Sequence, residues 1–337
     1  MKKVYNCLIV LIALFAGSSC NDEWEDEQFE HYVSFKAPVG DKGCTNINIR
    51  YKKDGKVTYQ LPLVVSGSTM NDQDLTVHVA VDPDTLSVFN QERFSTRTEL
   101  YYKELPQKYY KFPETVNIAA GEYTSLLDID FTLNDLDLVD HWILPITILD
   151  GSSYGYQSNM RKNYRKALLR ILPFNDYSGA YSTTNMKVYF YKEPENGDDD
   201  DVLGDPMIAN TRTAFVVDDN TIFFYAGLMD EDLPRDKRAL YKIYVRFDEN
   251  GALTLIPDNN EIEFEVPDNV SPSYTLTENW DDTRPYIKHK YVTLRFTYYF
   301  NDITSATVPI RYKVTGSLLM ERKINTQIPD EDQAIEW

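Results

Sequence analysis

The stretch Thr45-Asn-Ile-Asn-Ile-Arg-Tyr51, followed by Asp54-Gly55 and by a strand-like run over residues 57–65, decides the fold class of this chain. Polar and apolar residues alternate in the first segment, which is the pattern of a strand with one buried face. Asp-Gly between two such runs is typical of a tight hairpin turn. We therefore predict two strands joined by a hairpin, in an all-β protein.

Further segments on both sides of this stretch alternate in the same way, and turn-forming residues such as Asp82-Pro83-Asp84 separate them. Short strands in such number over residues 31–172 predict an N-terminal immunoglobulin-like β-sandwich. Pro62 and Pro145 lie inside strand-like runs, which predicts edge positions or bulges there. Residues 86–105 hold either a short helix or a long loop. The predicted strands are 31–37, 45–51, 57–65, 74–81, 114–119, 124–132, 142–149 and 166–172.

The segment Leu172–Gly179 predicts a domain boundary, because a second series of strands begins after it. Tight turns join these strands, so residues 173–323 predict a meander closed into a lipocalin-like β-barrel, which removes exposed edges. A second β-sandwich is the alternative. Residues 324–337 are predicted to be a C-terminal extension. The predicted strands are 180–191, 211–217, 221–226, 239–247, 252–256, 261–266, 273–278, 287–300 and 307–321.

The N-terminal residues predict a secreted, lipid-anchored protein. Lys2 and Lys3 precede a short apolar run and the small residues Gly17-Ser18-Ser19, which is the pattern of a signal peptide over residues 1–19. The apolar run is too short to cross a bilayer, which takes about 20 residues. Cys20 looks like the lipid-attachment cysteine of a bacterial lipoprotein. The acidic residues after it resemble the surface-export signal of Bacteroides-type lipoproteins, so residues 20–30 form the predicted tether. We expect an outer-membrane protein exposed at the cell surface.

The net charge and the cysteine content exclude several classes of ligand and of metal site. The net charge of −19 argues against nucleic acid, whose binding needs a basic surface. A neutral glycan or a divalent cation is compatible with this charge. Once Cys7 is removed and Cys20 is lipidated, Cys44 remains alone, so no intramolecular disulfide and no cysteine-based zinc site can form. The four histidines show no metal-ligand spacing. We predict no cofactor.

Several stretches resemble one known family, the surface lipoproteins of Bacteroides polysaccharide-utilisation loci. Its N-terminal Ig-like domain of unknown function also precedes some family-18 glycoside hydrolases. The resemblance implies a cell-surface accessory protein that binds glycans. It rests on Val33–Pro38, Tyr59–Gly67, Val81–Leu86 and Phe112–Gly121 for the N-terminal domain, and on Pro173–Tyr181, Asn210–Asp218 and Ile324–Trp337 for the C-terminal domain.

No catalytic motif accompanies the resemblance. Leu127-Asp-Ile-Asp-Phe-Thr132 superficially matches the acidic motif of family-18 enzymes, but Thr132 stands where the proton-donating Glu would be. The chain also lacks the alternating strands and helices of a TIM barrel. We therefore predict that Asp128 and Asp130 face outward from an alternating strand, with Ile129 and Phe131 inward. The prediction is a protein that is not an enzyme.

Aromatic residues in polar segments are the candidate glycan contacts. Sugar rings pack on exposed aromatic faces while nearby carboxylates and arginines bind the hydroxyl groups. The polar, Pro-containing segment Asn279–Tyr286 predicts such a site. In the segment Tyr101–Tyr110, adjacent tyrosines face opposite sides of a strand, so one ring of each pair should point outward. The candidates are Trp280, Asp281, Asp282, Arg284 and Tyr286, together with Tyr101, Tyr102, Tyr109 and Tyr110.

The acidic run Asp198, Asp199, Asp200 and Asp201 is a weak candidate for calcium, which takes six to eight oxygen ligands. Its spacing is not that of a calcium-binding loop, so a solvated acidic loop is the alternative. We predict no other metal site.

These features together predict a non-catalytic lipoprotein that binds a polysaccharide or oligosaccharide and assists its capture by an outer-membrane importer protein. A structural or adhesion protein that holds partner proteins at the outer-membrane surface is the alternative. A glycoside hydrolase of unrecognised type is a second alternative, because two carboxylates at a suitable separation suffice for that chemistry.

Overall fold

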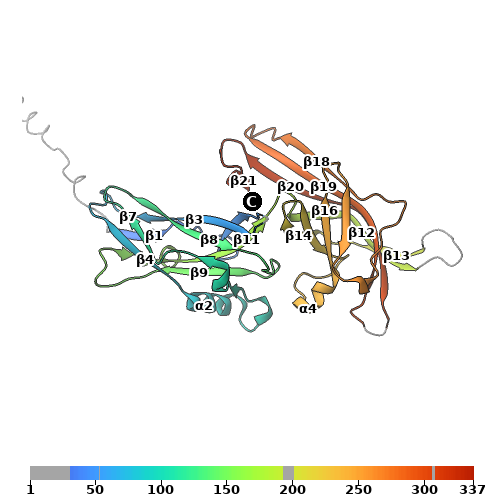
Figure 1. The fold of residues 1–337 in the computed structure, drawn as a ribbon, viewed down its shortest axis with the longest axis horizontal. Helices are drawn as coiled ribbons and strands as arrows, with labels where there is room; N and C mark the ends of the chain where they lie inside the picture. The colour runs from blue at the N-terminus through green and yellow to red at the C-terminus, as the bar shows by residue number, and fades with distance from the viewer. Residues whose placement is uncertain (1–30, 53, 193–200, 306–307) are drawn as a thin grey trace, which may run out of the picture.

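The computed structural model describes residues 31–52, 54–192, 201–305 and 308–337 (Figure 1). Strands account for 51% and helices for 11%, so the predicted all-β class is confirmed. The predicted signal peptide and tether, residues 1–30, lie outside the described residues. Within the described part of the chain, no helix has both the length and the apolar character needed to cross a membrane.

The N-terminal half consists of two curled open sheets. The first sheet has the order β10-β1-β3-β8-β6, and the second has the order β2-β11-β9-β4-β7, with β5 paired to β9. The strands are β1 (Tyr32–Phe35), β2 (Thr45–Arg50), β3 (Lys56–Val65), β4 (Leu75–Val81), β5 (Lys103–Glu104), β6 (Tyr110–Lys111), β7 (Thr115–Ile118), β8 (Thr124–Thr132), β9 (Trp142–Ile148), β10 (Gln157–Ser158) and β11 (Lys166–Phe174).

One hydrophobic core lies between the inner faces of these two sheets. Alternation places it there: Ile47 and Ile49 of β2 are buried, whereas Asn46 between Thr45 and Ile47 is exposed. The same period on β8 buries Ile129 of the first sheet against the same cluster. The two-sheet organisation predicted for this half is therefore present.

The predicted hairpin between the first two quoted segments is wrong. The chain does turn there, with the Gly55 N–H donating to the Lys52 carbonyl at 2.7 Å and Gly55 at a φ of 66°. However, β2 pairs in parallel with β11, and β3 pairs with β1 and β8 in the other sheet. The turn therefore carries the chain from one sheet to the other, because β2 finds a partner much later in the sequence.

The two strand prolines are not on edge strands, which corrects that prediction. Pro62 lies in β3 and Pro145 in β9, and both strands have neighbours on each side. The Pro62 carbonyl accepts from the Lys36 N–H at 2.8 Å, and the Pro145 carbonyl accepts from the Asp82 N–H at 3.0 Å. Both donors directly follow the end of the neighbouring strand. Each proline nitrogen thus faces the end of a ladder, where no N–H is required.

Helix α2 (Pro83–Phe94) settles the alternative left open for residues 86–105. Asp82 caps it, accepting from the Thr85 N–H at 3.2 Å and from the Thr85 hydroxyl at 2.7 Å. The helix covers a small cluster that contains Cys44, Leu86, Tyr102 and Ile143. Short 3₁₀ turns follow it at Thr98–Leu100 (η2) and Gln107–Tyr109 (η3), and α3 (Lys162–Arg165) precedes β11.

The C-terminal half is one curled ten-stranded sheet. Its main order is β17-β16-β15-β14-β12-β20-β19-β18, and β13 and β21 pair with β12 and β20. It surrounds a second hydrophobic core with the fully buried Tyr181 and Tyr298. The elements are β12 (Gly179–Lys192), β13 (Asp201–Met207), β14 (Thr211–Asp218), β15 (Thr221–Tyr225), α4 (Arg235–Arg238), η4 (Ala239–Tyr241), β16 (Lys242–Phe247), β17 (Leu253–Pro257), η5 (Asn260–Ile262), β18 (Ser273–Trp280), β19 (Ile287–Asp302), β20 (Ile310–Asn325) and β21 (Ile335–Glu336).

The predicted barrel closure is not present in the described sheet, which stays open between its end strands β17 and β18. A single bridge between Ala252 and Ser273 joins them. β17 spans only Leu253–Pro257, whereas β18 continues to Trp280 and pairs with residues 288–295 of β19. Most of β18 is exposed as a result. The strand predicted at 261–266 is instead the turn η5 with one isolated bridge, and β13 was not predicted.

The two halves meet beside the connection formed by residues 175–178 (Figure 1). Val139 of the N-terminal half packs in one cluster with Phe223 and Tyr225 of the C-terminal half. Arg238 of α4 reaches across to the carboxylates of Asp140 at 2.9 Å and Asp137 at 3.3 Å. The junction is therefore both packed and ion-paired.

Candidate ligand-binding sites

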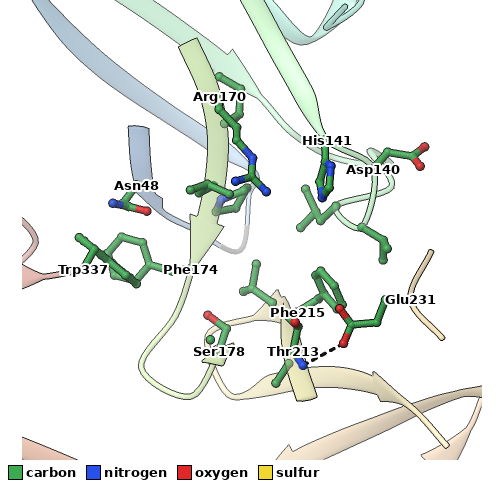
Figure 2. Close-up of a pocket in the computed structure, with 18 of the residues that line it drawn as sticks. Asn48, Asp140, His141, Arg170, Phe174, Ser178, Thr213, Phe215, Glu231 and Trp337 are labelled. Atoms are coloured by element: carbon green, nitrogen blue, oxygen red, sulfur yellow. Dashed lines mark hydrogen bonds between the residues drawn. The ribbon is translucent and has the colours of Figure 1, made fainter. Parts of the chain in front are cut away.

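A cavity of about 460 Å³ lies between the two halves of the chain (Figure 2). β11 contributes Arg170, which lies between the core residues Leu169 and Ile171 and so points to the opposite face of its sheet. β14 contributes Phe215 from the other half. Both charged and apolar side chains line the cavity, as is usual for small-molecule sites.

Trp337 forms part of the same wall. Its ring is 58% exposed and meets the Phe174 ring edge-on, with 4.8 Å between the centroids. The Arg322 guanidinium lies 5.3 Å from the Trp337 ring centroid, in cation–π geometry. The C-terminal residue of the chain thus lies at the domain junction.

The charges around this cavity are mixed. Burial, together with the nearby cations Arg170 and Lys42, lowers the pKa of His141 to about 4. Asp140 accepts from the Lys103 ammonium at 2.7 Å and from Arg238. Although burial raises the pKa of Asp140, these two cations outweigh it and leave that pKa below its ordinary value.

The predicted segment around Trp280 lies at the turn between β18 and β19. The Trp280 ring is 57% exposed, and it lines an open hollow with Asp281 and Asp282. His289 and Tyr291 of β19 line the same hollow. Asn279 and Trp280 belong to β18 rather than to a loop.

The other two residues predicted for this segment do not line that hollow. Arg284 pairs with Asp281 at 3.3 Å and approaches Glu336 at 3.9 Å. Tyr286 is 37% exposed, and its carbonyl accepts from the Thr326 N–H at 2.9 Å. The structure therefore brings together three of the five predicted residues.

Asp281 organises the turn. Its carboxylate accepts from the Thr283 hydroxyl at 2.7 Å and from the backbone N–H groups of Thr283 and Arg284, and these bonds hold its pKa well below the ordinary value. It also lies 3.2 Å from the Nε2 atom of His289. Asp281 is thus committed to the turn, which leaves Asp282 as the exposed carboxylate beside Trp280.

His289 should be protonated at a higher pH than an ordinary histidine. Its Nδ1 atom lies 2.5 Å from Glu321, and this bond and the one to Asp281 raise its pKa above 6.5. We expect the Glu321→Gln variant to bring that pKa down, as measured by NMR titration. The pairing stabilises the fold below pH 6.5, and that contribution disappears as pH rises through the raised pKa. An unchanged His289 titration in Glu321→Gln would contradict this prediction.

The paired tyrosines divide as alternation predicts, with one buried ring in each pair. Tyr102 and Tyr109 are buried in hydrophobic clusters. Tyr101 is half-buried beside Phe94, and its hydroxyl donates to the Ser95 carbonyl at 2.6 Å. Tyr101, Tyr102 and Tyr109 therefore serve packing in this structure.

Tyr110 is the member of this set that reaches a hollow. It stacks on Phe112 with centroids 5.8 Å apart, and both rings line a cavity of about 540 Å³. Tyr154 lines it as well and stacks on the ring of His78 at 3.9 Å. This second aromatic surface lies on the N-terminal half.

The acidic residues set aside as non-catalytic face outward as predicted. Asp128 accepts from the Gln60 amide at 2.9 Å and Asp130 from the Thr58 hydroxyl at 2.6 Å, and both are exposed. Among the described residues, no three His, Cys, Asp or Glu side chains are placed to share a metal ion. The lipidation candidate Cys20 and the calcium candidates Asp198, Asp199 and Asp200 lie outside the described residues, and for Asp201 only the backbone is described.

Sequence reasoning missed the cavity between the domains. Arg170 is recognisable as an outward residue because it alternates with Leu169 and Ile171. No sequence signal places it near Phe215 or Trp337, which are far along the chain. Only the packing of the two halves brings these residues together.

Comparison with known families and structures supports the two-part organisation. A family model described as a domain of unknown function, DUF4973, matches residues 24–152, and a model described as a C-terminal domain matches residues 165–319. None of the curated proteins compared with the chain matches it.

Three solved structures from Bacteroides are similar over their whole length. A structural-genomics protein of unknown function from Bacteroides ovatus is 51% identical, with a TM-score of 0.80 and coverage of 91% of this chain and 100% of that one. A multidomain protein including DUF1735 from the same organism is 49% identical, with a TM-score of 0.79 and the same coverage. An auxiliary nutrient binding protein from Bacteroides thetaiotaomicron is 41% identical, with a TM-score of 0.78 and coverage of 92% and 100%. The chain therefore belongs to the same family of Bacteroides proteins as these three, with a DUF4973 domain followed by the C-terminal domain.

Proposed function

We propose that this protein is a non-catalytic, lipid-anchored protein of the outer cell surface that binds a polysaccharide or oligosaccharide for import. The observation that carries the proposal is the exposed Trp280 ring at a hollow with carboxylate and imidazole groups beside it. An aromatic face next to hydrogen-bonding groups suits a sugar ring, which offers C–H faces and hydroxyl groups.

Two further observations support the proposal. A relative at 41% identity is named an auxiliary nutrient binding protein. The N-terminal sequence, with Cys20 after small residues and before an acidic run, is compatible with a lipid anchor at the outer membrane. An importer protein of the outer membrane is the partner that such a role requires.

Affinity electrophoresis in gels containing neutral polysaccharides tests the proposal with the chain that lacks its predicted signal peptide. Retardation by at least one polysaccharide is the expected result. Release of reducing sugar from the retained polysaccharide would overturn the non-catalytic part of the proposal. Mobility unchanged by every polysaccharide would overturn glycan binding.

We expect Trp280→Ala to weaken polysaccharide binding at least several-fold and to leave the melting temperature unchanged. The ring is 57% exposed, so its removal costs contact with a ligand rather than core packing. Affinity electrophoresis and calorimetric unfolding measure the two effects. Tyr123→Ala is the matched control, because Tyr123 is an exposed ring (48%) on the N-terminal half, in neither hollow. Equal affinities of Trp280→Ala and Tyr123→Ala would remove Trp280 from the site.

A further inference from the structure

We propose that the cavity between the two domains is a second ligand site, and that it binds the carboxylate of an acidic sugar such as a uronic acid through Arg170. The site is separate from Trp280. It rests on the proposed function only in taking the ligand to be a sugar.

In the part of the chain that the structure describes, Arg170 has no carboxylate partner, although its guanidinium lies 5.9 Å from the centroid of the Tyr102 ring. Among the described residues, its guanidinium makes no hydrogen bond and no ion pair, and its Nε atom is buried without an acceptor. A buried donor without a partner costs free energy, so it calls for an explanation. Figure 2 shows this guanidinium extending from β11 into the space beside His141.

Arg238 and Arg311 also have a buried Nε atom without a hydrogen-bond partner, but they differ from Arg170 because each is paired with a carboxylate. Arg238 binds the carboxylate of Asp140 at 2.9 Å, and Arg311 binds that of Glu265 at 2.7 Å. Each of these two is therefore neutralised within the fold. Arg170 is the one of the three that leaves its charge available to a ligand.

The acidic residues of the cavity wall are largely committed elsewhere. Asp140 is held by Lys103 and Arg238, and Glu231 accepts from the backbone N–H of Thr213 at 2.9 Å. Asp232 is the remaining acid on this wall. A carboxylate ligand would therefore meet one acid that is not otherwise engaged, Asp232, and the cation Arg170.

Two cations, Arg170 and Lys42, act on His141 at this cavity, although the net charge of the chain is −19. Each of them lowers the pKa of His141 more strongly than Asp232 or Asp140 raises it. Lys42 lies exposed at the same cavity. A second cation at the rim would attract an anion toward Arg170.

The size and lining of the cavity favour a sugar acid over a bare anion. Its volume of about 460 Å³ falls in the range of small-molecule sites, roughly 300–1,000 Å³. Phe215 and Trp337 supply apolar surface for a ring, while the planar guanidinium can bind both oxygens of a carboxylate.

Calorimetric titration with D-galacturonate and D-galactose tests the proposal, because these sugars share ring stereochemistry and differ in the carboxylate at C6. We expect galacturonate to bind at least tenfold more tightly than galactose. Arg170→Gln should remove at least tenfold of that affinity, since a charge-assisted hydrogen bond is lost. Arg161→Gln, an exposed arginine on the N-terminal half, should leave it unchanged.

NMR titration of the histidines gives an independent readout. Bound carboxylate beside Arg170 should raise the pKa of His141 and leave that of His289 unchanged, because added negative charge favours the imidazolium. Equal binding of the two sugars, or equal galacturonate binding by wild type and Arg170→Gln, would overturn the proposal. Neither result touches neutral-polysaccharide binding at Trp280, which the Trp280→Ala comparison tests separately.

Discussion

Replacing Arg238 by alanine is expected to lower the free energy of unfolding by about 3 kcal/mol. Arg238 is only 6% exposed, and its guanidinium pairs with Asp140 at 2.9 Å and Asp137 at 3.3 Å across the domain junction. It also donates to the Leu233 carbonyl at 3.2 Å. Its removal leaves Asp140 paired with Lys103 alone and Asp137 with Arg235 alone. Both remaining cations are largely exposed, so the two largely buried carboxylates lose their one buried cation, which is costly in a low-dielectric site.

The ion pair between Arg238 and Asp140 should also make the free energy of unfolding of the wild type depend on pH. Burial raises the pKa of Asp140, but the bonds from Lys103 and Arg238 outweigh burial and leave the folded pKa below 3.8. A lowered folded pKa means that the contribution is present above pH 3.8 and is lost as pH falls below that value. Acid should therefore weaken the junction, and Arg238→Ala should show less of this acid sensitivity.

Urea denaturation monitored by circular dichroism measures the effect, and Arg235→Ala is the control. Arg235 pairs with the same Asp137 at 3.0 Å, yet its side chain is 70% exposed. An exposed pair contributes about 0.5 kcal/mol, so this variant should unfold nearly as the wild type does. If both variants lost equal stability, burial of Arg238 would not be what makes the pair matter.

Local alternation predicted the strands well because it depends on neighbouring residues alone. Ile47 and Ile49 are buried, and Asp128 and Asp130 are exposed, as their period of two requires. The hairpin from β2 to β3 could not be judged from its turn, because β2 pairs in parallel with β11, from Leu169 onward. Pairing over such a separation leaves no mark in the turn residues.

The same limit applies to the sites. Trp280 could be singled out because a large aromatic ring in a polar segment is a local feature. Alternation predicts one outward ring in each tyrosine pair of the 101–110 segment, but which of these rings reaches a hollow depends on the neighbouring elements. The junction cavity depends on Arg170 and Phe215 meeting across two domains, which no local pattern encodes. Whether the C-terminal sheet closes into a barrel likewise depends on where β17 ends, at Pro257.

Replacing Gly316 by alanine is expected to lower the free energy of unfolding by about 3 kcal/mol. Gly316 lies in β20 at a φ of 127°, opposite Met186 of β12, where the register shifts between Ser182 and Asn185. A Cβ atom there would lie 2.0 Å from the backbone carbonyl oxygen of Asn185. Because the obstacle is main chain in a paired strand, it cannot rotate away, and β12 must separate from β20.

Gly121→Ala separates the steric cost from the conformational one. Gly121 also has a positive φ, 84°, but a Cβ atom there would meet nothing within 4 Å. This variant should therefore lose only the backbone contribution, about 1 kcal/mol. Urea unfolding of both variants gives the comparison. A loss in Gly316→Ala no larger than that in Gly121→Ala would mean that β12 and β20 can part at this point without cost. A larger loss, accompanied by dye binding to exposed hydrophobic surface, would mean that contact of the two backbones at Gly316 holds the curled C-terminal sheet around its core.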